Sequence, residues 1–233
     1  MADTTRQKFF QNQGYHLLAW VIIGSILYLE SRRYNISGTM RIWGWSAGKW
    51  LFLSWVFAAL HQGWVWFFWR LELYRGKITD RFGPGGFLGY RIGFVLFASV
   101  RLFPLVPISL ATERSLLIPR WLSFALIVIT MPFIIWGLFS VVMYFGINRA
   151  FGADHFEERY REGGLEKRGI FKYVPNAMYT VVLLALYHPG LLVGSRLGLV
   201  AALGHHLFVW THYFCTERPD MKEIYREKSD SKV

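Results

Sequence analysis

The sequence predicts an all-α, polytopic membrane protein with about six transmembrane helices. Its 233 residues are 54% hydrophobic and their mean hydropathy is positive, which is too apolar for an ordinary soluble domain of this length. Apolar runs near the length that a helix needs to cross a bilayer recur along the chain. The six predicted spans are residues 14–29, 50–69, 87–111, 121–146, 176–193 and 197–214.

The first and the fifth predicted spans each have distinctive flanking residues. The first span has charged flanks, lacks a signal-cleavage pattern and is followed by more spans, so we expect a retained anchor. The fifth is short and ends at His188 and Pro189, so we expect it to form a tight helical hairpin with the sixth. Residues 1–233 are then one membrane domain, in which the spans of 1–86 serve as scaffold.

The distribution of Lys and Arg predicts the orientation. With the N-terminus inside, the inner segments hold 18 basic residues and the outer loops hold seven. Basic loops resist translocation, so both termini are predicted to be cytosolic, at a bacterial inner membrane or the endoplasmic reticulum. The net charge of +11 is spread over juxtamembrane loops and mixed with acids, which favours contact with anionic lipid over nucleic acid.

The third span is unusual, because Arg101, Pro104 and Pro107 interrupt its apolar run. An arginine at membrane depth must face a partner or water, and the prolines free backbone carbonyls nearby. Two interpretations follow. Either the span ends near residue 100 and an interfacial loop follows, or a bent helix lines a polar cavity.

The last helix carries polar residues at helical spacing, which predicts a polar cavity open towards the cytosol. One stripe is His206, Trp210, Tyr213 and Glu217, and the next is His205, Phe208, His212 and Thr216. A metal site is not predicted. His205 and His212 lie about 10 Å apart along the axis, too far to share one ion, and the single cysteine, Cys215, excludes a cysteine cluster and an intrachain disulfide.

Two polar stretches flank the hairpin of the fifth and sixth predicted spans, GIFKYVPNAMYT at its start and TERPDMKEIY at its end. Together they resemble the C-terminal, cofactor-binding half of the integral-membrane methyltransferases, the group that includes phosphatidylethanolamine N-methyltransferases and isoprenylcysteine carboxyl methyltransferases. That group carries a G-x-[FY]-[RK]-[YF]-x-R-[HN]-P-x-Y element and a later acidic one. The matching positions here are Gly169, Phe171, Lys172, Tyr173, Asn176, Met178, Tyr179, Glu217 and Tyr225.

The likeness covers residues 145–225 and departs from the pattern at three positions. Pro175 replaces the usual arginine, Ala177 the usual proline and Arg218 the second glutamate. Asn176 with the Met178 and Tyr179 that follow is nearer to the phospholipid branch than to the prenylcysteine branch.

The resemblance implies an S-adenosylmethionine-dependent methyltransferase in phospholipid biosynthesis, with its site facing the cytosol and S-adenosylhomocysteine as product. The acceptor it implies is a membrane lipid, in the first place the amine of phosphatidylethanolamine or a methylated derivative. Glu217 can accept hydrogen bonds from the amino and ribose groups, and Lys172 can bind the carboxylate. Aromatic faces can attract the sulfonium. The predicted cofactor-binding residues are Lys172, Tyr173, Asn176, Met178, Tyr179, Trp210, Glu217 and Tyr225.

A lipid amine must lose its proton before it attacks, so a base near neutral pKa is useful, and His206, His212 and Glu217 are the candidates. Alternatives stay open. Within the enzyme class they are carboxyl methylation of a prenylated cysteine and methylation of a small thiol. Outside it they are a non-catalytic transporter or scaffold and a nicotinamide-dependent membrane reductase. The sequence sets no oligomeric state.

Overall fold

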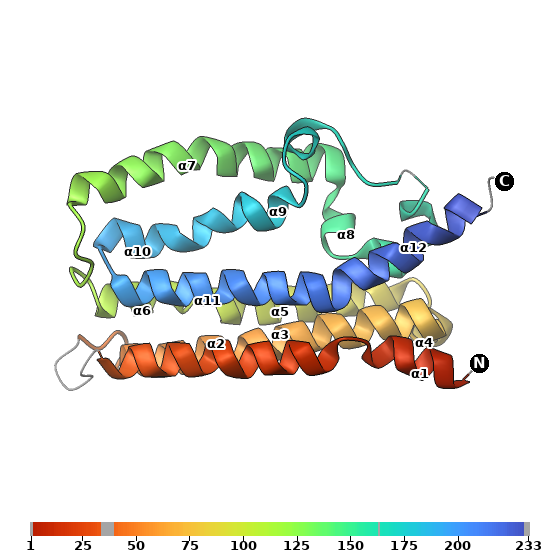
Figure 1. Ribbon diagram of the computed structural model, residues 1–233, viewed down its shortest axis with the longest axis horizontal. Helices are drawn as coiled ribbons and strands as arrows, with labels where there is room; N and C mark the ends of the chain where they lie inside the picture. The colour runs from red at the N-terminus through yellow and green to blue at the C-terminus, as the bar shows by residue number, and fades with distance from the viewer. Residues whose placement is uncertain (1, 34–39, 163, 231–233) are drawn as a thin grey trace.

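The long helices of the protein lie side by side along one axis (Figure 1). The computed structural model describes residues 2–33, 40–162 and 164–230, and within these ranges there is no strand, only an isolated bridge between Ile42 and Trp45. The predicted all-α class is therefore confirmed. The α-helices are α1 (Ala2–Phe10), α2 (Gln13–Arg33), α3 (Ala47–Arg75), α4 (Lys77–Phe82), α5 (Gly85–Leu102), α6 (Leu105–Ala111), α7 (Arg120–Ser140), α8 (Ile147–Ala150), α9 (Ala177–Thr180), α10 (His188–Val193), α11 (Arg196–His212) and α12 (Arg218–Asp230).

Tighter or wider helical turns join several of these helices. Two π-helical turns, η1 (Val141–Phe145) and η6 (Tyr213–Glu217), extend α7 and α11. The 3-10 segments are η2 (Ala153–His155), η3 (Glu158–Tyr160), η4 (Gly169–Lys172) and η5 (Val182–Tyr187).

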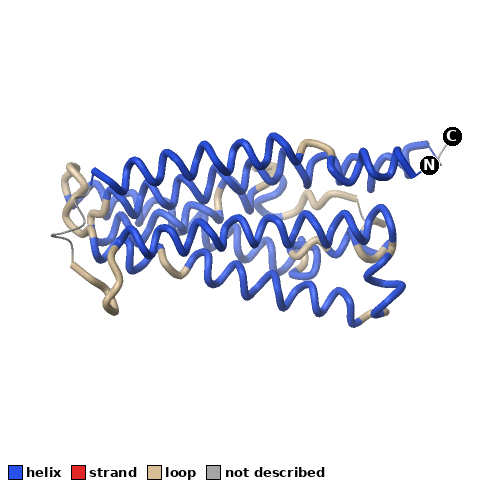
Figure 2. The backbone as a smooth tube through the Cα atoms, turned by 90° about the horizontal axis from the view of Figure 1, so that it is seen from below, coloured by secondary structure: helices blue, strands red, loops and turns tan. Residues whose placement is uncertain are grey.

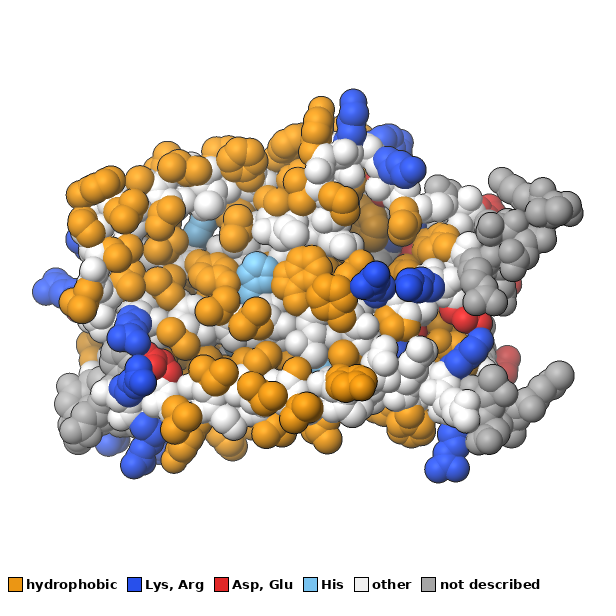
Figure 3. Space-filling model, viewed as in Figure 1, with side chains coloured by type: hydrophobic (Ala, Val, Ile, Leu, Met, Phe, Trp, Pro, Cys, Tyr) orange, Lys and Arg blue, Asp and Glu red, His pale blue; other side chains and the backbone are white. Residues whose placement is uncertain are grey.

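Among the described residues, four helical stretches are long and apolar enough to cross a membrane, which marks an integral membrane protein. They are Thr5–Arg33, Ala47–Arg75, Gly85–Ala111 and Arg120–Phe145. They contain the first three predicted spans and all but the last residue of the fourth. Figure 3 shows hydrophobic side chains over the middle of one face, with Lys and Arg nearer its ends.

The fifth and sixth predicted spans differ from these four. The fifth corresponds to Ala177–Val193, a shorter apolar stretch in which η5 separates α9 from α10. The sixth corresponds to α11, which continues through η6 into α12. Both chain ends lie at the same end of the bundle (Figure 1). A total of six spans and cytosolic termini remain predictions.

Figure 2 shows the long helices of the bundle running along one another. One hydrophobic core cluster lies among α2, α3, α6 and α11, which pack together. Trp55 of α3 packs on Phe208 of α11, with ring centroids 5.1 Å apart, and stacks on Trp20 of α2 at 5.9 Å. Small residues allow close approach: a Cβ on Gly24 would meet the Trp55 indole at 2.3 Å. This core fixes α11, and with it the polar residues that follow α11.

Arg101 lies inside this bundle and not in an interfacial loop. Helix resumes at Leu105 after Pro104, and the Arg101 side chain is only 2% exposed. Its Nε donates to His205 Nδ1 at 3.0 Å and its terminal nitrogens contact His61 Nδ1 at 3.2 Å and the His205 carbonyl oxygen at 3.1 Å. Imidazole and carbonyl acceptors therefore satisfy this buried cation in a closed polar cluster.

Ser54 completes that cluster, which gives a stability prediction. Its hydroxyl donates to the Arg101 carbonyl oxygen at 2.5 Å and contacts His205 Nε2 at 2.7 Å. We expect Ser54→Ala to lower the free energy of unfolding by ~1–3 kcal/mol, because it leaves the His205 ring nitrogen and this carbonyl without partners. Thermal unfolding in detergent measures this. Ser25→Ala, at an exposed position of α2, is the control, and equal midpoints for both variants would contradict the expectation.

Candidate functional site

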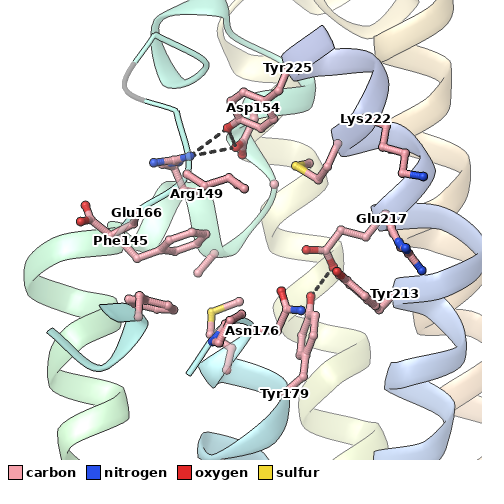
Figure 4. A pocket seen from close by; sticks show the side chains of 18 of the residues that line it. Phe145, Arg149, Asp154, Glu166, Asn176, Tyr179, Tyr213, Glu217, Lys222 and Tyr225 are labelled. Carbon is pink, nitrogen blue, oxygen red and sulfur yellow. Dashed lines mark hydrogen bonds and ion pairs between the residues drawn. The ribbon is translucent and has the colours of Figure 1, made fainter. Parts of the chain in front are cut away.

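A cavity of about 540 Å³ lies at the end of the bundle that carries α12. Its wall comes from η1, the segment that follows it, α9, η6 and α12 (Figure 4). The two polar stretches singled out in the sequence meet here. Five of the predicted site residues line the cavity: Asn176, Met178, Tyr179, Glu217 and Tyr225.

A tight turn brings the first stretch to the cavity. Asn176 precedes α9 with φ 56°, in the left-handed region that Asn tolerates better than most residues. Its carbonyl oxygen accepts from the Tyr179 backbone N–H at 2.8 Å, which begins α9. The Asn176 and Tyr179 side chains thus reach the same wall of the cavity.

Glu217 lies next to Tyr179 in the cavity wall. The Tyr179 hydroxyl donates to Glu217 Oε2 at 2.5 Å (Figure 4), and the π-helical turn η6 shifts Glu217 relative to the phase of α11. Glu217 lies beyond the sixth predicted span. Burial raises the pKa of its carboxyl from 4.5 to about 7, opposed by the hydrogen bond from Tyr179 and assisted by repulsion from Asp154 and Asp220.

Tyr225 connects α12 to the segment after η1. Its hydroxyl donates to Asp154 Oδ2 at 2.7 Å and accepts from Arg149 at 2.8 Å, and Arg149 also donates to the Gly164 carbonyl oxygen at 2.8 Å. Gly152, between these partners, has φ 82°, and a Cβ there would meet the Trp69 indole at 2.4 Å. Glycine is therefore required at this position.

This network predicts a local effect of Tyr225→Phe. Loss of the hydroxyl removes a shared partner of Arg149 and Asp154, so we expect faster amide exchange in residues 149–164 and a loss of ~1–2 kcal/mol in the free energy of local opening. Hydrogen–deuterium exchange measures it. Tyr15→Phe, at an exposed position of α2, should leave this segment unchanged. Equal protection in both variants would exclude the role assigned to the hydroxyl.

Arg70 of α3 connects the N-terminal half of the chain to α12. It is fully buried, and its Nε donates to Asp220 Oδ1 at 3.1 Å. Its other nitrogens donate to the carbonyl oxygens of Phe9, Gln11 and Cys215 at 2.9, 2.8 and 3.1 Å. Four segments of the chain thus meet at one guanidinium, close to the start of α12 and to Glu217.

The cavity lining includes four cationic side chains. They belong to Arg149, Lys167, Arg218 and Lys222. Within the described residues, the ammonium groups of Lys167 and Lys222 have no hydrogen-bond or ion-pair partner, so both are available to an anionic group of a ligand. Glu217 and Asn176 offer oxygen acceptors elsewhere on the wall. The donor set fits a zwitterionic ligand.

The remaining predicted site residues lie outside this wall. Lys172 and Tyr173 are exposed, with the Lys172 ammonium 5.6 Å from the Tyr173 ring centroid. Trp210 packs edge-on against Tyr179 at 6.0 Å. His206 contacts the Tyr187 hydroxyl at 3.1 Å and the Tyr179 carbonyl oxygen at 2.6 Å, so both ring nitrogens have partners.

His212 is buried and does not line the cavity. Its ring lies 5.6 Å from both His16 and Trp69, measured between centroids, and neither of its nitrogens has a hydrogen-bond partner among the described residues. Trp69 itself lines the cavity. Of the three candidate bases, Glu217 is the one that the cavity contains.

Several lining residues were not predicted. Arg149, Asp154 and Lys167, from the charged stretch 148–172, line the cavity although none of them was among the predicted site residues. Gly152 and Asp154, between the predicted span and the first motif, are the turn signals in the sequence that point to a folded segment. Phe145, Tyr213, Met221 and Lys222 also line it.

A comparison with family models matches residues 119–228 to the phospholipid methyltransferase family. The match begins just before α7, earlier than the motif likeness in the sequence, and runs into α12. No curated protein and no solved structure matches the chain. The resemblance to the integral-membrane methyltransferases is thus confirmed by the match of residues 119–228 to the phospholipid methyltransferase family model.

Proposed function

We propose that this protein transfers the methyl group of S-adenosylmethionine to the amine of a membrane phospholipid, either phosphatidylethanolamine or a methylated derivative. The observation that carries the proposal is the hydrogen bond between Tyr179 and Glu217 in one cavity, whose lining also holds two lysines without a partner among the described residues. The family match supports methyl transfer at a membrane. The predicted orientation places this cavity at the cytosolic side, where the soluble cofactor is found.

The lining residues fit the polar groups of the cofactor. Glu217 would accept hydrogen bonds from its amino or ribose groups, and Lys167 or Lys222 would bind its carboxylate. Lys172, predicted for the second role, lies outside the wall. The rings of Tyr179 and Tyr213, 5.9 Å apart, offer faces to a sulfonium. The volume of about 540 Å³ is within the range of about 300–1,000 Å³ for small-molecule sites.

When bound, the cofactor supplies an electrophilic methyl group. The protein's part is to hold acceptor and donor in line and to exclude water. Phe145, Phe171 and Met178 line the cavity and keep much of its wall apolar. Glu217, with a pKa near 7, is the lining residue suited to take a proton from the acceptor amine if the amine reaches it.

The class of methyl acceptor is inferred from the positive charge of Arg218. Arg218 lines the cavity at a position where the related methyltransferases carry a second glutamate. A cation there favours an acceptor that carries a phosphate next to its amine.

Acceptor profiling tests the proposal. The purified protein in mixed lipid vesicles is given radiolabelled S-adenosylmethionine, and the lipid and soluble products are separated. We expect label in methylated phosphatidylethanolamine. No labelled lipid from a protein that binds S-adenosylhomocysteine would overturn the lipid acceptor, and label on a prenylated cysteine ester or a small thiol would identify the alternative acceptor.

A binding measurement separates methyl transfer from other classes of function. S-adenosylhomocysteine is expected to raise the thermal unfolding midpoint of the protein. No shift would favour a transporter or scaffold. A shift with NADPH alone would favour a reductase.

A further inference from the structure

A second cavity, of about 280 Å³, lies between α2 and α3 and shares no lining residue with the first. Positions 13, 16, 17 and 20 of α2 and 59, 62, 63 and 66 of α3 line it, which is one face of each helix. Phe208 of α11 also contributes to the lining. We call this cavity the α2–α3 groove.

Gln62 is the polar residue that requires an explanation. It is 4% exposed, lies within the stretch Ala47–Arg75 and lines the groove. Its side-chain amide has no hydrogen-bond partner among the described residues. An amide without a partner is costly in a membrane, where no water replaces the missing bond. A ligand in the groove would supply that partner.

His16 provides a second unpaired group. Gln13 Nε2 donates to the carbonyl oxygens of Gln11 and Cys215, so its Oε1 must be the acceptor of the 3.1 Å bond to His16 Nδ1. His16 Nδ1 therefore carries the hydrogen, and Nε2 of the neutral ring is an acceptor. That Nε2 has no partner in the described structure, but it is fully buried, so a ligand in the groove would reach the Gln62 amide and not this nitrogen.

The charge and shape of the groove limit its occupant. None of the described residues that line it is Asp, Glu, Lys or Arg, so neither a phosphate nor an ammonium group would be neutralised there. Trp20 and Trp66 provide apolar walls. Gly63 leaves room, because a Cβ built on it would meet nothing within 4 Å.

We propose that the α2–α3 groove binds a neutral lipid that carries a hydroxyl group. The hydroxyl bonds to the Gln62 amide, donating to its oxygen, and the hydrocarbon lies against Trp20 and Trp66. This site is separate from the methyl-transfer cavity and does not depend on the function proposed for that cavity.

Photolabelling of the full-length protein in phosphatidylcholine nanodiscs tests the site. The probe is a long-chain primary alcohol with a diazirine in its chain, and the control probe is its methyl ether, which cannot donate a hydrogen bond. We expect saturable labelling of α2 and α3 residues at the groove, competed by unlabelled alcohol and about tenfold weaker with the ether. Equal labelling by both probes would overturn the role of the hydroxyl.

Three variants locate the label. Gly63→Leu fills the groove and Gln62→Leu removes the amide at similar volume, so each is expected to reduce labelling about tenfold. Gly89→Leu of α5 is the matched control, because its Cβ would also meet nothing within 4 Å. Thermal unfolding midpoints identify any variant that does not fold. Undiminished labelling in folded Gln62→Leu, or labels confined to the first cavity, would overturn the proposal.

Discussion

Replacement of Arg70 by alanine is expected to lower the free energy of unfolding by ~3–5 kcal/mol, because it leaves Asp220 charged, buried and without its cation. Both side chains of this pair are fully buried. The carbonyl oxygens of Phe9, Gln11 and Cys215 lose a donor as well. Unfolding in a denaturing detergent, followed by tryptophan fluorescence, measures the change.

A charge-free double variant separates loss of the ion pair from loss of packing. Arg70→Leu with Asp220→Leu removes both charges, so it is expected to recover the part of the lost stability that comes from the unpaired Asp220 charge, while the part that comes from the three carbonyl oxygens remains lost. Arg81→Ala, exposed on α4, should change the free energy of unfolding by less than about 0.5 kcal/mol. A loss in Arg70→Ala no larger than in Arg81→Ala would show that the pair does not stabilise the protein.

The Arg70 contacts also define what the N-terminal half contributes. The family match begins at residue 119, so α1 to α6 lie outside it. Arg70 nevertheless reaches from α3 to Asp220, three residues after Glu217, and Trp69 beside it lines the cavity. Through Arg70, α3 therefore holds the start of α12 in place, so the spans predicted to serve as scaffold contact the cavity wall.

Much of the fold could be predicted because long apolar runs have few other solutions in a membrane. The first four predicted spans coincide with the four long helical stretches of the described residues, with ends that differ by up to nine residues. Arg101 was harder. Its partners His61 and His205 lie 40 and 104 residues away, so the sequence alone left an interfacial loop and a bent helix equally open.

The site residues that belong to a sequence motif could be predicted. Residues whose direction depends on the local helical turn were harder to predict. Asn176, Tyr179 and Glu217 line one cavity, as a shared site requires. Lys172 and Tyr173 end up exposed because the 3-10 segment η4 turns them outwards, and such a segment leaves no periodic signal. The contribution of Asp154 depends on its tertiary contact with Tyr225, which no local pattern reveals.

Glu217→Gln is expected to weaken S-adenosylhomocysteine binding about 10- to 100-fold, the size of a hydrogen bond to a charged group. The amide keeps the shape of the side chain but removes the negative charge next to the ligand's amino group. Calorimetry with purified protein measures the affinity. Glu223→Gln is the matched control on α12, since Glu223 pairs with Lys8 at 2.5 Å and does not line the cavity. Equal losses in both variants would argue against a direct contact.

The pH dependence of S-adenosylhomocysteine binding tests the role of the Glu217 carboxylate directly. In the free protein the Glu217 carboxyl keeps its proton up to about pH 7, so its native pKa is raised above the unfolded value. Its contribution to stability is therefore lost as pH rises from 4.5 towards 7. A ligand that favours the carboxylate must displace this proton below about pH 7, so its affinity should rise with pH and level off above that value. Because Gln cannot titrate, Glu217→Gln should abolish the rise of affinity with pH. An unchanged slope in this variant would show that another group causes the pH dependence.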